Sequence, residues 1–272
     1  MVFSLITSSR NRSKLLKMRS LPSVLAQTSR QFEWVFINDG GDPATRDAIA
    51  SIETDFPIVY SEMEHPSDGF GLCHGRNFGL SLAQGEWVAY LDDDNAIAPE
   101  FVETAIAFME EHPEVACAMT RQSRRRDITR DGKAVKRGNS FISPSFPANV
   151  EALIRHRELF DSNGFIHRLI GSPRWNPSYR VYADYEYFLQ CLCVWGRDRF
   201  AVLPEVLVDY VQSSDGVIGQ SGHGEWAAEL KQLLDESARF EGVLGSEDKV
   251  QLARLQQKFE ERADRPLAAF VA

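Results

Sequence analysis

The chain has 272 residues, of which 43% are hydrophobic, and its formal net charge is −9. This size and composition predict a soluble globular protein with one large domain and room for a smaller appendage. The acidic balance argues against general nucleic-acid binding, which requires a basic face.

Strand and helix patterns alternate through the first half of the chain. Apolar runs predict strands over residues 2–7, 32–38, 57–63 and 86–91. Helical patterns lie between them, over residues 11–27 with a kink at Pro22, after the loop of residues 39–47 through Ile49, and over residues 75–85. This alternation predicts an α/β fold with a mostly parallel sheet and helices on both faces.

Polar clusters follow three of these strands: Ser8 to Arg10, Asn38-Asp39, and Asp92 to Asn95. Ligands of such sheets bind beyond the carboxyl ends of the strands, so we expect the clusters to form one site. In the third cluster three adjacent aspartates repel one another, which is costly unless something positive lies there. A solvated acidic turn that caps the next helix is the alternative.

The second half of the chain is less regular. Residues 121–138 are strongly basic around the turn "RDGK", which predicts a polar hairpin. Residues 182–196 predict a helix that ends at a glycine, and the Ser/Gly-rich residues 212–224 predict a mobile loop. Helical patterns dominate from residue 225 to about residue 263.

Three sequence blocks together resemble glycosyltransferase family 2. They are "LITSSRNRSKLLKMRSLPSVLAQTSRQFEWVFINDGG", "GRNFGLSLAQGEWVAYLDDDN" and "WNPSYRVYADYEYFLQCL". The resemblance spans roughly residues 2–215 and implies a GT-A fold that transfers sugar from a nucleotide sugar with inversion. It places a catalytic domain at residues 1–224, with a nucleotide-binding half to about residue 120 and an acceptor-side half over 121–224. Residues 225–272 would form a helical C-terminal extension.

The resemblance implies that the aspartate cluster binds a metal ion. Asp94 would ligate Mn²⁺ or Mg²⁺, and Asp92 would contact the ribose or a metal-bound water. Asp93 is grouped with the nucleotide-sugar-binding residues, although its side chain is expected to point away from the metal. Hard cations prefer oxygen ligands, and such a metal stabilises the charge of a leaving diphosphate.

The nucleotide contacts follow from the same resemblance. Asp39 would accept the imino N–H of uracil or thymine, so a UDP-sugar is the first expectation and a dTDP-sugar the second. Ser8 and Arg10 would flank the base and the ribose, and Arg76 would reach the diphosphate. The structural alternatives are a plain turn residue at Asp39 and a surface arginine at position 76.

Asp184 aligns with the family's catalytic base, which deprotonates the acceptor hydroxyl. Ala183 replaces the acid that usually precedes it, and Glu186 is the fallback base. The structural alternative for Asp184 is an acid favoured by the N-terminus of a helix.

The family often completes its metal site with a histidine shortly after a tyrosine like Tyr210, and that histidine is absent here. His223 and Asp215 are the nearby candidates, and residues 212–224 fit a lid over bound donor. The remaining histidines are expected to be structural: His65, His74, His112, His156 and His167.

Location and partners follow from composition. Four cysteines without a CxxC spacing favour reduced thiols in a cytoplasmic protein. We expect no signal peptide and no transmembrane segment, with peripheral membrane contact left open. The basic residues 121–137 either carry solvated charge or contact an anionic acceptor, such as a lipid diphosphate or acidic glycan. They lack interleaved aromatics, which disfavours single-stranded nucleic acid.

The sequence thus predicts a metal-dependent inverting glycosyltransferase with a glycan, lipid-linked or small-molecule hydroxyl acceptor. The C-terminal helices either pack on the catalytic core or mediate self-association. Two alternatives remain. A non-catalytic glycan- or nucleotide-binding relative is favoured by Ala183 and the missing histidine. A nucleotidyltransferase would need a glycine-rich phosphate loop, and "TSSRNRSK" has no glycine.

Overall fold

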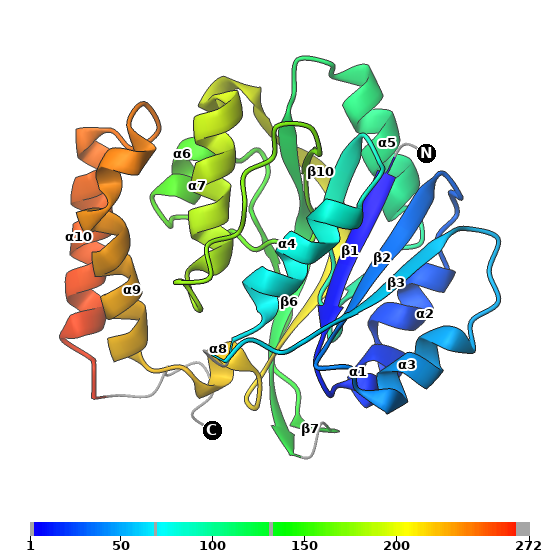
Figure 1. The fold of residues 1–272 in the computed structure, drawn as a ribbon. Coiled ribbons are helices and arrows are strands. Elements are labelled where there is room, and N and C mark those ends of the chain that lie inside the picture. Colours follow the sequence, from blue (N-terminus) through cyan, green and yellow to red (C-terminus); the bar gives the residue numbers. More distant parts are fainter. Residues whose placement is uncertain (1–2, 68–69, 131–132, 265–272) are drawn as a thin grey trace.

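The structure, a computed structural model, describes residues 3–67, 70–130 and 133–264. One curled sheet with helices on both sides dominates the described residues (Figure 1). Its strands are β1 (Phe3–Ser9), β2 (Phe32–Asp39), β3 (Ile58–Met63), β4 (Trp87–Tyr90), β5 (Ala96–Ile97), β6 (Cys117–Arg130), β7 (Lys133–Lys136), β8 (Phe141–Ser143), β9 (Phe165–Arg168) and β10 (Phe200–Ser213). The α-helices are α1 (Ser13–Met18), α2 (Ser20–Leu25), α3 (Pro43–Ala50), α4 (Leu72–Leu82), α5 (Phe101–Glu111), α6 (Val150–Ile154), α7 (Ala183–Trp195), α8 (Val217–Gln220), α9 (His223–Asp235) and α10 (Ser246–Glu260). Two 3₁₀ turns are η1 (Arg197–Arg199) and η2 (Ser237–Phe240).

The sheet has a parallel half and a mixed half. Its strand order is β3-β2-β1-β4-β9-β6-β10-β5, with β7 and β8 also paired to β6. The first four strands are parallel, so the ends of β1 and β2 lie side by side, with Ser9 opposite Asn38. Antiparallel β9 joins them to the parallel pair of β6 and β10. The irregular second half of the sequence therefore supplies β9, the strand that runs antiparallel to both of its neighbours.

Side chains that alternate along the buried strands pack into two hydrophobic cores, one on each face of the sheet. On β2, Trp34 and Phe36 pack with residues of α1, α2, α3 and α5, whereas Val35 and Ile37 pack with residues of α4 and α7. Because side chains alternate across a strand, a strand that is apolar at every position needs helices on both faces. The predicted coverage of both faces is confirmed.

Two glycines let α4 lie directly on the ends of β1 and β2. A Cβ atom at Gly71 would stand 1.9 Å from Asp39 Oδ2, and one at Gly75 would stand 2.1 Å from Ser8 Oγ. Any larger residue would push the helix away from the sheet edge. Gly71, the N-cap residue of α4, and Gly75, the first residue of the second sequence block, therefore position α4 against the polar strand ends.

The predicted helix over residues 11–27 is divided into α1 and α2. The break falls at Arg19, whose φ and ψ are −126° and −81°, and the predicted kink at Pro22 is wrong. Pro22 lies in the first turn of α2, where its missing N–H costs no helical hydrogen bond. The Arg19 side chain donates to Asp94 O at 3.2 Å and to Asp209 Oδ2 at 3.0 Å, which fixes the break against the strand ends.

The C-terminal helices pack on the rest of the chain. Leu230 and Leu233 of α9 and Leu252 of α10 share one core cluster with Leu189 of α7. The predicted loop at residues 212–224 contains the end of β10, α8 and the first turn of α9, so it has more regular structure than expected. No helix among the described residues is long and apolar enough to cross a membrane.

Candidate active site

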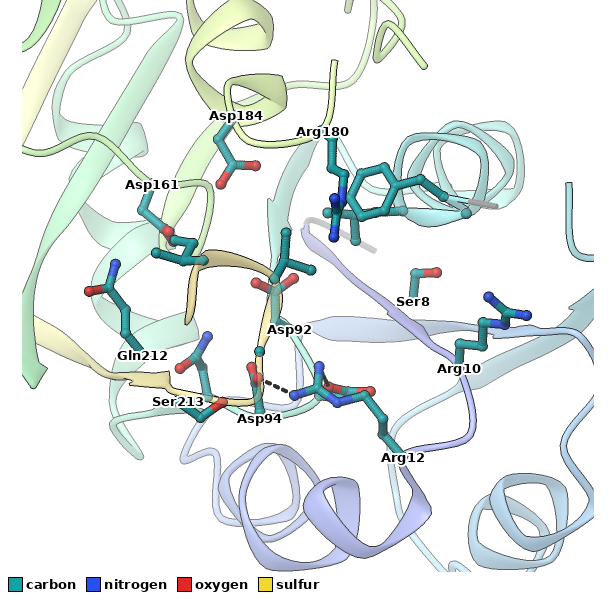
Figure 2. Close-up of a pocket in the computed structure, with 18 of the residues that line it drawn as sticks. Ser8, Arg10, Arg12, Asp92, Asp94, Asp161, Arg180, Asp184, Gln212 and Ser213 are labelled. Atoms are coloured by element: carbon teal, nitrogen blue, oxygen red, sulfur yellow. Dashed lines mark hydrogen bonds and ion pairs between the residues drawn. The ribbon is translucent and has the colours of Figure 1, made fainter. Parts of the chain in front are cut away.

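A cavity of about 270 Å³ opens at the carboxyl ends of the parallel strands (Figure 2). Ligand sites typically enclose about 300–1,000 Å³, so the cavity fits a small organic ligand that remains partly exposed. The three polar clusters of the sequence meet there, together with α7 and the end of β10. The lining residues used below are Ser8, Arg10, Arg12, Asp39, His65, Asp92, Asp93, Asp94, Asp161, Arg180, Asp184, Gln212 and Ser213.

Arg76 links two of the aspartates. Its guanidinium donates through Nη1 to Asp184 Oδ1 at 2.6 Å and through Nη2 to Asp92 Oδ1 at 2.8 Å. The side chain is 2% exposed, and it lies over the Trp175 ring at 4.3 Å. Arg76 does not line the cavity, and both donor nitrogens face protein carboxylates. It is therefore not a surface arginine, and its guanidinium faces carboxylates in this structure, so the contact with a diphosphate stays a prediction.

The electrostatics of this bridge are consistent with its geometry. Burial lowers the pKa of Arg76, but the charges of Asp184 and Asp92 outweigh burial and raise that pKa above its usual value. The guanidinium thus stays charged and holds both carboxylates. Asn163 donates to the other oxygen of Asp92, Oδ2, at 2.8 Å, so Asp92 is held on both sides.

Arg12 neutralises the remaining two aspartates of the cluster. It pairs with Asp93 Oδ1 through Nη1 at 2.8 Å and with Asp94 Oδ2 through Nη2, a contact drawn in Figure 2. Ser9 also donates to Asp93 Oδ2 at 2.6 Å. Burial raises the pKa of Asp93 to about 7 and also raises that of Asp94, while Arg12 opposes both shifts. Something positive does lie at the aspartate cluster, as the sequence suggested, and in this structure it is an arginine.

The alternative function of the cluster as a helix cap is excluded. The following helix, α5, has Glu100 as its N-cap residue and receives no side-chain cap. Asn95, at the end of the cluster, instead accepts a hydrogen bond from the backbone N–H of Val211 at 2.8 Å, which ties the cluster to β10.

The donor set of the cluster suits a hard divalent cation only in part. Carboxylate oxygens are the ligands that Mg²⁺ and Mn²⁺ prefer, and Asp94 keeps 19% of its side chain exposed to the cavity. Yet no group of three or more His, Cys, Asp or Glu side chains among the described residues converges on a metal position. A metal held by Asp94 would therefore take most of its ligands from the bound diphosphate and water, and Arg12 would move aside.

Asp39 lines the cavity and has an unexpected partner. Its carboxylate is 4% exposed and pairs with His65 Nδ1 at 2.8 Å. His65, predicted to be structural, thus lines the cavity and orients Asp39. Ser8 is partly buried and Arg10 is exposed at the end of β1, and both line the same cavity.

Two further cavity residues have no counterpart among the predicted site residues. Asp161 is buried and accepts a hydrogen bond from Asn163 Nδ2 at 2.8 Å. Burial, followed by the charge of Asp184, raises the pKa of Asp161 to about 6. Arg180 lies over the Phe70 ring at 5.8 Å, three residues before the start of the helix that carries the candidate base. Figure 2 shows Asp161 and Asp184 on one side of the cavity.

Three of the secondary candidates lie outside the cavity. Glu186 is fully buried and bonds Arg239 Nη2 at 2.7 Å, so it cannot serve as a fallback base. His223 begins α9, and its ring lies 5.8 Å from that of Phe259. Asp215 accepts a hydrogen bond from the hydroxyl of Thr129. The structure brings neither His223 nor Asp215 to Asp94; Gln212 and Ser213 occupy the cavity wall after Tyr210.

Comparison with known sequences identifies the family. The sequence profile described as Glycosyl transferase family 2 matches residues 4–170, more than half of the chain. The chain belongs to glycosyltransferase family 2. The resemblance read from the three sequence blocks is confirmed.

Curated relatives match shorter segments of this family 2 chain. An uncharacterized glycosyltransferase of Rickettsia bellii is 31% identical over 133 residues, which cover 49% of the chain and 18% of the relative. Glycosyltransferase GlyA of Streptococcus pneumoniae is 34% identical over 87 residues, or 32% of the chain and 12% of the relative. The chain thus spans less than a fifth of the length of these relatives.

Solved structures support the fold expected for family 2. S. aureus TarS 1–349 in complex with UDP-GlcNAc superposes with a TM-score of 0.69 at 18% identity, covering 96% of this chain and 72% of that one. Mannosyltransferase PcManGT from Pyrobaculum calidifontis, in complex with GDP-Man and Mn²⁺, gives 0.62 at 16% identity, with coverages of 98% and 74%. The predicted GT-A fold with C-terminal helices is confirmed.

Proposed function

We propose that the protein transfers a sugar from a nucleotide diphosphate to a hydroxyl acceptor with inversion, and that residues 1–224 form its catalytic domain. One observation carries the proposal: a single cavity joins a base-reading candidate (Asp39), an aspartate cluster at a strand end (Asp92 to Asp94) and an acid of α7 (Asp184). Family membership supports the reaction class. TarS bound to UDP-GlcNAc and to UDP supports a uridine donor first, with a thymidine donor second.

The donor would lie across the ends of β1 and β2. Asp39, fixed by His65, would accept the imino N–H of the base, with Ser8 and Arg10 beside the base and ribose. Since Arg76 is occupied by carboxylates, Arg180 takes over the expected contact with the diphosphate. It lines the cavity with 43% of its side chain exposed, and among the described residues its ion pair is with Glu225, at 2.7 Å. An arginine at a partly exposed site suits phosphate recognition because its planar fork presents several donors.

Asp94 would hold a Mn²⁺ or Mg²⁺ ion, which supplies positive charge to the leaving diphosphate. The Mn²⁺-bound state of PcManGT supports a metal at this class of site. The residues that surround the donor would then orient the sugar towards the wall formed by Asp161 and Asp184.

Asp184 would accept the proton of the acceptor hydroxyl as that oxygen attacks the sugar. Arg76 holds Oδ1 of Asp184, and Figure 2 shows the carboxylate directed into the cavity. A base on the wall opposite the leaving diphosphate leads to in-line attack, which inverts the configuration at the sugar carbon.

The decisive test replaces Asp184 by Asn. The amide keeps the shape and the contact with Arg76 but accepts no proton, and loss of a general base typically lowers the rate by ~10²–10⁴. We expect transfer from UDP-sugars to fall by that factor while UDP binding, measured by calorimetry, stays within a few-fold of wild type.

Two variants serve as controls for this test. Glu186→Gln alters the same helix outside the cavity and should retain the rate, whereas Asp161→Asn tests the neighbouring acid. If Asp161→Asn abolishes transfer and Asp184→Asn retains it, the base is Asp161. If no donor is turned over by the wild type in the presence of Mn²⁺, the non-catalytic alternative replaces the proposal.

A further inference from the structure

The predicted basic hairpin forms an extended edge of the sheet, made by residues 128–130 and 133–142, which we call the basic ribbon. It comprises the end of β6, β7 and the first two residues of β8, and Figure 1 shows β7 beyond the main body at the far end of β6. The turn of the hairpin, residues 131–132, lies outside the described residues. The ribbon carries Arg130, Lys133, Lys136 and Arg137, and the sequence places Asp127 directly before it and Asp131 between its two segments.

These four cations differ from the basic residues nearer the sheet. Arg124 lies over the Tyr210 ring at 4.0 Å, and Arg125 pairs with Asp209 at 2.8 Å, so both belong to the fold. The four ribbon side chains, in contrast, are exposed and make no ion pair or side-chain hydrogen bond with another described residue. In a chain of net charge −9, they form a local cationic surface that internal partners do not account for.

Exposed apolar side chains accompany the charges. Val135, Phe141 and Ile142 are 59%, 41% and 50% exposed, and Phe146, just beyond the ribbon, is 50% exposed. A soluble domain rarely gathers large apolar side chains in water without a partner. A polyanionic glycan would be matched by the charges alone and would leave these side chains in water. An interface that holds anionic head groups above acyl chains satisfies both features.

We propose that the basic ribbon docks the protein on an anionic phospholipid surface. The arginine and lysine side chains would meet the lipid phosphates, and the apolar side chains would enter the head-group boundary. The ribbon is also tied to the cavity wall: Thr129 N donates to Ser214 Oγ at 2.9 Å, and Ser213 lines the cavity. Docking would therefore hold the cavity near the membrane, where a lipid-linked acceptor resides; this last step alone rests on the proposed function.

The test measures vesicle binding and requires no enzyme activity. The full chain is sedimented with vesicles of phosphatidylcholine alone and of equal parts phosphatidylcholine and phosphatidylglycerol. We expect binding only to the anionic vesicles, with affinity that falls as salt rises. The variant K133E/K136E/R137E should bind at least about 100-fold more weakly, because each basic residue near an anionic surface contributes about fivefold. The variant V135S/I142S should bind more weakly than wild type but keep the salt dependence.

A matched control makes the same change of net charge elsewhere. Arg254, Lys258 and Arg262 are exposed on and just after α10, away from β7 in Figure 1. The variant R254E/K258E/R262E should retain binding within a few-fold. Equal losses in both triple variants would overturn the proposal, since the effect would then reflect net charge. Binding of wild type to soluble dextran sulfate but not to anionic vesicles would assign the ribbon to a polyanionic polymer. If the wild type binds neither dextran sulfate nor anionic vesicles, the proposal fails. The charges would then serve to protect a sheet edge against aggregation.

Discussion

The buried bridge made by Arg76 is the feature whose loss has the clearest consequence. Arg76→Met keeps the volume of the aliphatic stem but removes the cation that holds Asp92 and Asp184. Breaking a buried ion pair from one side typically costs about 3–5 kcal/mol, because the remaining charge is left without a partner. Here Asp92 and Asp184 keep 28% and 27% of their side chains exposed, so water can relieve part of the penalty. We therefore expect a loss of about 3 kcal/mol in the free energy of unfolding, the lower end of that range.

Urea unfolding followed by tryptophan fluorescence measures this loss. Arg76→Lys should lie between wild type and Arg76→Met, since one ammonium cannot reproduce a fork whose two nitrogens bond separate carboxylates. Arg180→Met is the matched control. Arg180 is partly exposed and its pair with Glu225 lies at the surface, so its removal should cost less than about 1 kcal/mol.

Substitutions of Arg76 and Arg180 should have the opposite order of effect on UDP affinity: the change at Arg180 should be the more harmful one. Calorimetry with UDP should show a loss of affinity for Arg180→Met that is larger than the loss for Arg76→Lys. If Arg76→Met has wild-type stability and weakens UDP binding alone, Arg76 contacts the diphosphate, and the reasoning from the buried bridge is refuted.

Three further variants test the donor site and the core. Asp39→Ala should weaken UDP binding by about 1–3 kcal/mol and leave ADP binding unchanged by calorimetry; equal weakening of both would show that Asp39 does not read the base. Asp94→Asn should abolish the Mn²⁺-dependent gain in UDP affinity, and an unchanged gain would exclude Asp94 as the ligand. Burial lowers the pKa of His156 from 6.5 to about 4, so this group favours folding above pH 6.5 and the contribution is lost as pH falls towards 4. The destabilisation caused by His156→Asn, measured by urea unfolding, should therefore be about 2 kcal/mol smaller at pH 5 than at pH 7, and an equal destabilisation at both would contradict burial of a neutral histidine.

The sequence predicts the fold and the location of the site well because both depend on local patterns. Strand periodicity gives the parallel strands, and parallel strands place their carboxyl ends at one edge. The sequence alone therefore predicts that Ser8, Asp39 and the aspartate cluster lie close to one another. The helix predicted over residues 75–85 is found as α4, shifted by three residues to Leu72–Leu82, and the close approach of Gly71 and Gly75 to the strand ends is seen only in the structure.

The partners of the site residues are not encoded locally. Arg12 and Arg76 are both basic residues that follow a strand or lie on a helix, and sequence spacing does not tell which carboxylates they meet. Arg76 contacts Asp184, 108 positions away, because α4 and α7 pack on the same face of the sheet. His65 and Asp161 lie in segments without a recognisable pattern. The number of charged residues near the strand ends could have suggested ion pairs within the protein. Which residues pair with each other depends on the tertiary structure.

The balance of charge in the cavity connects these contacts to the proposed reaction. Six aspartates line it: Asp39, Asp92, Asp93, Asp94, Asp161 and Asp184. The lining cations are Arg10, Arg12 and Arg180, with Arg76 behind them. Arg76 and Arg12 are already committed to aspartates, so a diphosphate that enters this cavity would add negative charge where acids outnumber free cations. A divalent cation held by Asp94 would offset that repulsion, and Arg12 would then be available to the donor. On the proposed function, the acidic lining would favour a metal-bound nucleotide over a free one, because the metal would offset the negative charge of the diphosphate.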